Sequence, residues 1–180
     1  MSPTISGEAR VSDSARVSDS ARVSDSAWVF DSARVFDSAW VSDSARVFGS
    51  AQVFGSAEVS GSAQVFGSAR VSGSARVFGS ARVSGSADIE DDSHIAWVDR
   101  VGRGSSVTLH RVRTDNGHGW RINAGCRAWE ADTVENVCDL VRQNVASGPA
   151  EWSEADETTR SRWAVQVDTA LTHLASMVSS

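Results

Sequence analysis

A six-residue repeat runs through the first half of the chain, from Ala9 to Ser86, with few changes. The first copies read ARVSDS three times in succession, and later copies such as AWVFDS, AQVFGS and AEVSGS differ at set positions. Each unit has the form A-x-V-y-z-S. In a strand, Ala and Val would point to one side and the polar or aromatic x to the other. Asp or Gly at z and the final Ser are turn formers, so the second half of each unit predicts a corner.

A strand and a corner every six residues predict a parallel β-helix rather than an α-helix or a hairpin meander. The A-x-V-y-G-S units resemble the hexapeptide repeats of left-handed parallel β-helices. The resemblance implies that three hexads make one triangular coil. Residues 3–92 then hold about five coils, if PTISGE and ADIEDD count as edge units. At about 4.8 Å between stacked strands, the rod would be about 24 Å long.

Three hexads per coil predict that residues eighteen positions apart lie on top of one another. Phe30, Phe48 and Phe66 have this spacing, and so do Phe36 and Phe54. The sequence therefore predicts two ladders of stacked aromatic rings, each pair contributing about 0.5–1.5 kcal/mol.

The z position of the hexads changes from Asp in the units between Asp13 and Asp43 to Gly in the units between Gly49 and Gly85. Stacked carboxylates repel one another unless they are paired or hydrogen-bonded to corner amides. Arg at x is the expected partner. A ladder of calcium sites is the alternative, although it requires several oxygen ligands around one point.

The outward x positions combine Arg with Trp and form a candidate contact surface. Such side chains can bind phosphates or stack on bases. The candidate residues are Arg16, Arg34, Arg70, Trp28 and Trp40. The alternative is a solvated face that prevents sheet-to-sheet aggregation.

The pattern changes at His94, after which the hexads stop. HIAWVDRV, VTLHRVRT and WRINAGCRAW predict three strands separated by glycine-rich turns. Apolar residues at 134, 137, 138, 141 and 145 predict a helix, and a final helix is expected to begin at Ser153 or Asp156. The fold class is therefore mainly β, with a β-helix over 1–92 and a small β-β-β-α-α domain over 93–180.

The second half also carries a resemblance. The segment SVTLHRVR…GWRINAGCRAWEADTVENVCDLV, with its Gly125-Cys126 pair, is similar to the cap of uncharacterised bacterial and phage proteins that carry related hexads. The resemblance implies an accessory protein of a phage or mobile element. It carries no agreed activity and assigns no functional residue.

Charge is uneven along this chain, which has a net charge of −6. Residues 97–127 form a basic island between acidic flanks, and such an island favours an anionic partner. The candidate ligand-binding residues are Arg100, Arg103, His110, Arg111, Arg113, Trp120 and Arg121. His110 is expected to face outward beside its arginine neighbours. The alternative is that the island pairs with its own flanks.

The function that these features favour is non-catalytic binding or scaffolding. Given a phage origin, the partner would be a host defence protein or a nucleotide, sequestered by this protein. The alternatives are a nucleic-acid contact through the basic hairpins and, less favoured, a hexapeptide-type acyltransferase. No catalytic residue, metal site or cofactor is expected. Cys126 and Cys138 are expected to be buried free thiols.

The ends of a β-helix expose unpaired strand edges and an apolar core. The C-terminal domain is expected to cover one end and a second copy of the chain the other, so a homo-oligomer, a dimer or a trimer, is predicted. The start MSPTISGEAR has no signal-peptide pattern, and no apolar run reaches the roughly 18 residues of a membrane span. The expected location is the cytoplasm (of the host, for a phage protein), with no membrane contact.

Overall fold

The computed structural model describes residues 2–101, 104–125, 127–147 and 156–178. Two-residue strands recur every six residues as far as Ile89 and form three five-stranded sheets. The first sheet contains β1 (Thr4–Ile5), β4 (Arg22–Val23), β7 (Trp40–Val41), β10 (Glu58–Val59) and β13 (Arg76–Val77). The second contains β2 (Arg10–Val11), β5 (Trp28–Val29), β8 (Arg46–Val47), β11 (Gln64–Val65) and β14 (Arg82–Val83). The third contains β3 (Arg16–Val17), β6 (Arg34–Val35), β9 (Gln52–Val53), β12 (Arg70–Val71) and β15 (Asp88–Ile89).

Neighbouring strands in each sheet are parallel and eighteen residues apart, as the pairing of Arg22 with Trp40 illustrates. This confirms the predicted solenoid of five coils with three strands in each. The predicted aromatic ladders also form. Ring centroids of Phe30 and Phe48 are 4.9 Å apart, and the planes are nearly parallel at 4°. Phe36 and Phe54 stack in the same way, at 4.9 Å.

The interior of the solenoid consists of the Ala and Val positions of the hexads. From Ala21 to Val83 every one of them is fully buried. Burying a Val side chain contributes about 1.5–3 kcal/mol, so the repeat supplies a continuous apolar core from one small and one medium side chain per strand.

The corners of the solenoid explain why only Asp and Gly occupy the z position. Asp13 has φ +57° and Gly49 has φ +71°, both in the left-handed region, which Gly tolerates freely and Asp more readily than most residues. The Asp31 carboxylate also accepts a hydrogen bond from the N–H of Gly49 at 3.0 Å, one coil further on. Corner amides are likewise the partners of Asp37 and Asp43, whereas Asp13, Asp19 and Asp25 accept from the hydroxyl of the preceding serine. Of these three, Asp13 and Asp25 also accept from a corner amide. Between described residues, no Arg of the repeat forms an ion pair with a corner Asp.

After the solenoid, a short 3-10 turn η1 (Asp92–His94) leads into a four-stranded antiparallel sheet in the order β16-β17-β18-β19. Its strands are β16 (Ile95–Val101), β17 (Ser105–Thr114), β18 (Gly117–Ala124) and β19 (Arg127–Ala131), followed by helices α1 (Val134–Ala146) and α2 (Glu157–Val178). The third strand expected from the sequence is thus divided in two, because the chain reverses at Gly125 with φ +60°. Asp156 accepts from the N–H of Thr159 at 2.7 Å at the start of α2, whereas Ser153 lies outside the described residues.

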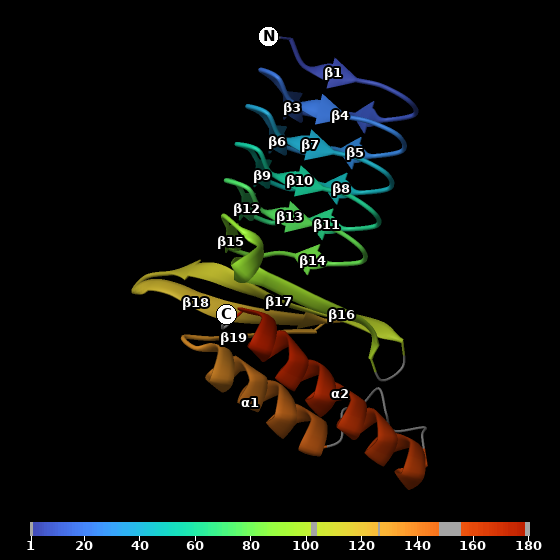
Figure 1. The fold of residues 1–180 in the computed structure, drawn as a ribbon, viewed down its shortest axis with the longest axis vertical. Coiled ribbons are helices and arrows are strands. Elements are labelled where there is room, and N and C mark those ends of the chain that lie inside the picture. Colours follow the sequence, from blue (N-terminus) through green and yellow to red (C-terminus); the bar gives the residue numbers. More distant parts are fainter. Residues whose placement is uncertain (1, 102–103, 126, 148–155, 179–180) are drawn as a thin grey trace.

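The molecule has three layers along its length (Figure 1). The coils stack in one row, the four-stranded sheet crosses the end that follows β15, and α1 and α2 lie on the far face of that sheet. One buried apolar cluster fills the solenoid as far as Ile95, and a second begins at Ala96 between the sheet and the helices. None of the described helices is both long enough and apolar enough to cross a bilayer.

Candidate functional site at the ends of the solenoid

The C-terminal end of the solenoid is closed by hydrogen bonds from the four-stranded sheet. Within the solenoid, each coil donates backbone N–H groups to the next, as Gln64 does to the carbonyl of Ala81 at 2.9 Å. The last coil has no successor. There the N–H of Arg82 donates to the Thr108 hydroxyl at 3.0 Å, and the carbonyl of Ser86 accepts from the backbone of the sheet at 2.9 Å. The sheet thus gives the N–H of Arg82 the acceptor that a sixth coil would otherwise provide, and it adds a backbone hydrogen bond to Ser86.

Asn123 lies at the centre of this closure. Its amide nitrogen donates to the carbonyl of Arg82 at 2.8 Å and to Nε2 of His110 at 3.0 Å. Its amide oxygen accepts from Ser84 at 3.2 Å and from Nε of Arg121 at 3.1 Å. Four contacts satisfy the whole hydrogen-bonding capacity of the buried amide, so its presence stabilises the junction rather than costing energy.

His110 is fully buried, so the expectation that it faces outward is wrong. Alternate residues of β17 point to opposite faces of the sheet, and Thr108 and His110 share the face that meets the last coil, whereas Leu109 faces the helices. Nδ1 of His110 lies 3.2 Å from the carbonyl of Arg111, which only accepts, so Nδ1 carries the proton and Nε2 accepts from Asn123. Desolvation by burial lowers the pKa of His110 to about 4, and the backbone bond opposes that shift.

Arg111 and Arg113, two of the predicted ligand-binding residues, are joined to the acidic segment that ends the solenoid. Nη2 of Arg111 lies 3.1 Å from the Glu90 carboxylate and 3.6 Å from that of Asp88. Arg113 lies 3.4 Å from Asp88 and donates to the carbonyl of Ser68 at 2.9 Å. These distances correspond to the alternative in which the basic island pairs with its own flank. Sequence reasoning had not singled out Asp88 as the shared partner.

The remaining candidate residues of the island are dispersed. Arg121 forms an ion pair with Glu130, next to its bond to Asn123. Trp120 is partly buried and packs on the apolar core between sheet and helices. Arg103 lies outside the described residues. Alternate positions of β17 and β18 are polar, which is also the pattern of a sheet face exposed to solvent, so the sequence carries no signal that identifies this face as the junction.

Arg100 differs from the other candidates because it occupies a bulge. The pairing of β16 with β17 shifts between Val98 and Val101, so that Asp99 and Arg100 together oppose Ser106. Arg100 has φ +59°, in the left-handed region, which costs about 1–2 kcal/mol for a residue with a side chain. Bulges of this kind re-aim side chains and are frequent beside binding sites.

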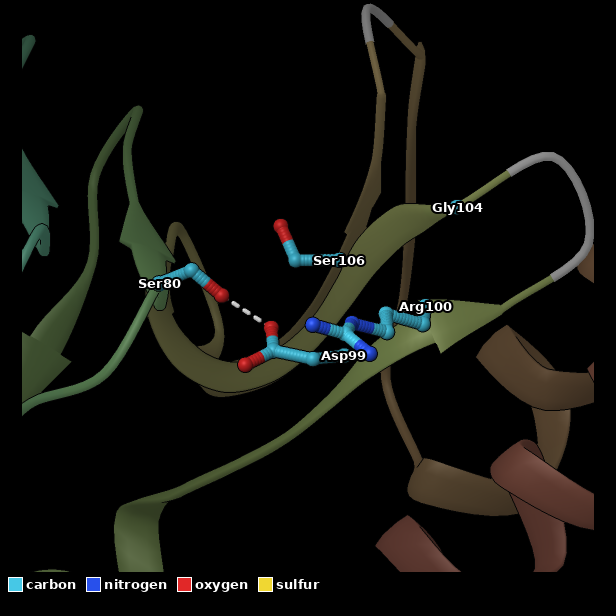
Figure 2. A pocket seen from close by; sticks show the side chains of 5 residues that line it. All are labelled: Ser80, Asp99, Arg100, Gly104 and Ser106. Atoms are coloured by element: carbon cyan, nitrogen blue, oxygen red, sulfur yellow. Dashed lines mark hydrogen bonds between the residues drawn. The ribbon is translucent and has the colours of Figure 1, made fainter.

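A hollow of about 340 Å³ adjoins this bulge. Figure 2 shows Ser80 reaching it from the last coil, and Asp99, Arg100 and Ser106 reaching it from β16 and β17. Ser80 donates to Oδ1 of Asp99. In the described part of the chain, neither the Arg100 guanidinium nor the Ser106 hydroxyl has a hydrogen-bond or ion-pair partner, and both are accessible from the hollow.

The five Arg and Trp residues predicted to form a contact surface on the outside of the solenoid are spread over all three sheets. Arg16, Arg34 and Arg70 belong to the third sheet, and Arg70 stacks over the Phe54 ring at 5.2 Å. Trp28 belongs to the second sheet and donates to the Ser12 hydroxyl at 3.3 Å. The last candidate, Trp40, lies in the first sheet and donates to the hydroxyl of Ser24 at 3.2 Å. The structure therefore does not bring these five residues together into one surface.

The N-terminal end of the solenoid differs sharply from the closed end. Ile5 is 52% exposed, and Ala9, Val11, Ala15 and Val17 are only partly buried, although the same positions are fully buried from the next coil onward. An apolar core is therefore accessible at this end.

The strand edges at the N-terminal end also lack partners. The carbonyl of Ala27 accepts from the N–H of Arg10 at 2.9 Å, and that of Val29 from Ser12 at 3.0 Å. The equivalent carbonyls one coil earlier, those of Ala9 and Val11, accept from no coil in the described chain. This end presents both apolar surface and unpaired backbone, the two features of a strand-pairing interface.

Within the described ranges, no group of three or more His, Cys, Asp or Glu side chains is placed to hold a metal ion. Cys138 is a buried free thiol, as expected, and Cys126 lies outside the described residues. Burial also raises the pKa of the Cys138 thiol. Comparison of the chain with family models, with curated proteins and with solved structures finds no match in any of the three.

Proposed function

We propose that this protein is a non-catalytic scaffold in which two copies join through the N-terminal ends of their solenoids and hold their α+β domains at opposite ends of one rod. The observation that supports it is the contrast between the two ends of the solenoid. The Thr108 and Asn123 network occupies one end, whereas Ile5 and the edges of the first coil are open at the other.

A second copy fits the open end because its first coil has the same width, the same inward Ala and Val positions and the same unpaired edges. Head-to-tail stacking is blocked, since the four-stranded sheet covers the C-terminal end of each solenoid. Head-to-head contact is isologous, so it closes at two copies and forms no fibre.

The geometry of head-to-head contact also permits strand pairing. A two-fold axis perpendicular to the rod reverses the direction in which the strands circulate, so facing strands run antiparallel. Carbonyls such as those of Ala9 and Val11 can then accept from the partner's backbone. Acidic and basic residues alternate around this rim, with Glu8 and Asp13 beside Arg10 and Arg16, so no single sign of charge repels the second copy.

The test is the oligomeric state of the full chain by native mass spectrometry and light scattering, with X-ray scattering for shape. We expect a dimer whose longest dimension is about twice that of one subunit, because the contact is end to end. Ile5→Arg should give a folded monomer, since Ile5 is exposed within one chain. Val165→Arg, which adds the same charge at another exposed apolar residue on α2, should leave the dimer intact.

A monomeric wild-type chain, a trimer, or a dimer that Ile5→Arg leaves unchanged would each contradict the proposal. The origin in a phage or mobile element, the cytoplasmic location and the sequestration of a host protein or nucleotide stay predictions. So does the nucleic-acid alternative, although two residues of the basic hairpins, Arg111 and Arg113, contact acidic residues of their own chain.

A further inference from the structure

We infer that the hollow beside Arg100 is a binding site for a small phosphorylated compound that carries free hydroxyl groups, such as a pentose phosphate or a nucleotide. The site is separate from the N-terminal interface. It lies at the junction of the last coil with β16 and β17, where Ser80, Asp99, Arg100 and Ser106 line it (Figure 2).

The anionic part of the ligand is recognised by Arg100 and Ser106. A guanidinium presents several N–H donors in a fork that matches phosphate oxygens, and a hydroxyl donates one more hydrogen bond. Both groups lack partners among the described residues, whereas Arg111, Arg113 and Arg121 are paired with carboxylates. The bulge holds Arg100 at φ +59°. Backbone strain of this kind persists only where the surrounding structure enforces it, and strained residues cluster at binding and active sites.

The neutral part of the ligand is recognised by Asp99. Ser80 donates to one of its carboxylate oxygens, and the other, Oδ2, has no partner in the described chain. That oxygen can accept hydrogen bonds from hydroxyl groups of the ligand, and its negative charge repels any further anionic group beyond the phosphate that Arg100 binds. The pair of Arg100 and Asp99 therefore favours a phosphate monoester with hydroxyls over inorganic phosphate. A volume of about 340 Å³ suits a molecule of this size.

A small molecule is favoured over a nucleic-acid chain because the basic charge near the hollow is local. Arg100 faces Asp99 in the same site, and no continuous track of unpaired cations leads away from it among the described residues of the sheet. Binding of a polyanion depends on many such phosphate contacts.

The experiment is calorimetric titration of the full chain with ribose 5-phosphate, with inorganic phosphate and ribose as separate titrants. We expect saturable binding of ribose 5-phosphate that exceeds binding of either fragment. Arg100→Gln should weaken it by about tenfold or more, and Ser106→Ala by a few-fold, because charge-assisted hydrogen bonds are the stronger ones. Arg46→Gln removes the same charge from an exposed position on β8 and should change affinity by less than about twofold.

Arg100→Gly separates binding from folding. It removes the guanidinium and relieves the positive φ, so it should abolish binding while the protein melts no lower than the wild type. The inference is overturned by any of three results: no heat of binding up to about 10 mM ligand, equal losses in Arg100→Gln and Arg46→Gln, or inorganic phosphate binding as tightly as ribose 5-phosphate. Binding of a short oligothymidylate in place of ribose 5-phosphate would also overturn it, in favour of a nucleic-acid surface.

Discussion

The side-chain amide of Asn123 donates to Nε2 of His110 across 3.0 Å, in the buried layer between the last coil and the sheet. The other ring nitrogen of His110 already donates to a backbone carbonyl. A second proton on the ring would therefore place two donors against each other at Nε2, in addition to charging a fully buried group.

We expect this arrangement to make the stability of the protein depend on pH. The pKa of His110 is lowered from 6.5 to about 4 in the folded protein, so the unfolded chain binds the proton more readily. Stability is then complete above the unfolded pKa and is lost as the pH falls from 6.5 towards 4, by up to about 3 kcal/mol from this group. Urea unfolding at a series of pH values measures the loss.

The matched variants for this pH dependence are His110→Gln and His173→Gln. Gln keeps polar atoms at the junction but does not titrate, so His110→Gln should flatten the curve over that pH range, even if it lowers stability overall. His173 is exposed on α2, and its replacement should leave the curve unchanged. A wild-type curve with no slope between pH 6.5 and 4 would contradict the role assigned to His110.

Asp88→Ala should destabilise the junction strongly. The Asp88 side chain is 13% exposed and lies against Arg111 and Arg113, so its loss leaves Arg113 without a carboxylate partner among the described residues and the largely buried Arg111 with Glu90 alone. We expect a decrease of about 3 kcal/mol in the free energy of unfolding. Glu58→Ala removes a carboxylate from the exposed pair with Arg76 and should cost less than about 1 kcal/mol. Chemical denaturation measures both changes. An equal loss of unfolding free energy in the two variants would show that the ion pairs at the junction stabilise the protein no more than an exposed pair does.

Replacement of a corner aspartate tests the two roles of that position. Asp43 has φ +58°, and its carboxylate accepts from the N–H of Gly61 at 2.9 Å. Asp43→Ala loses the bond and strains the backbone, which should cost about 2 kcal/mol in total. Asp43→Gly loses only the bond, and Asp43→Asn should be closest to wild type. The order of thermal midpoints checks this, and an alanine variant as stable as the asparagine variant would refute it.

Arg100→Gly should raise the stability of the protein. Relief of the left-handed backbone favours the folded state by about 1–2 kcal/mol, and the greater freedom of glycine in the unfolded chain offsets about 0.4–1 kcal/mol of this. The expected net gain is about 0.5–1 kcal/mol, measurable by denaturant titration. Arg100→Ala keeps the strain and should show no gain, so a gain in both variants would point to charge rather than backbone geometry.

The sequence was sufficient for the solenoid because its information is local and repeated. A small residue at Ala21, a larger one at Val23 and a residue that tolerates positive φ at Asp25 specify one strand and one corner. The eighteen-residue coil then follows from stacking, and the Phe30–Phe48 ladder could be predicted from spacing alone. The helices were also predictable, from the apolar stripe and from Asp156 at the start of α2.

Only the tertiary structure decided what the polar residues of the second half do. Periodicity places Thr108, His110 and Asn123 on one face of the sheet, but it does not reveal what that face covers. That face meets the end of the solenoid, where unpaired backbone groups require donors and acceptors, and this is why a histidine and an asparagine are buried there. The same placement brings Arg111 into ion pairs with Asp88 and Glu90, whereas Arg100 lies beside a hollow without an ion-pair partner in the described chain. Long-range contacts, not sequence spacing, determine which charges are neutralised.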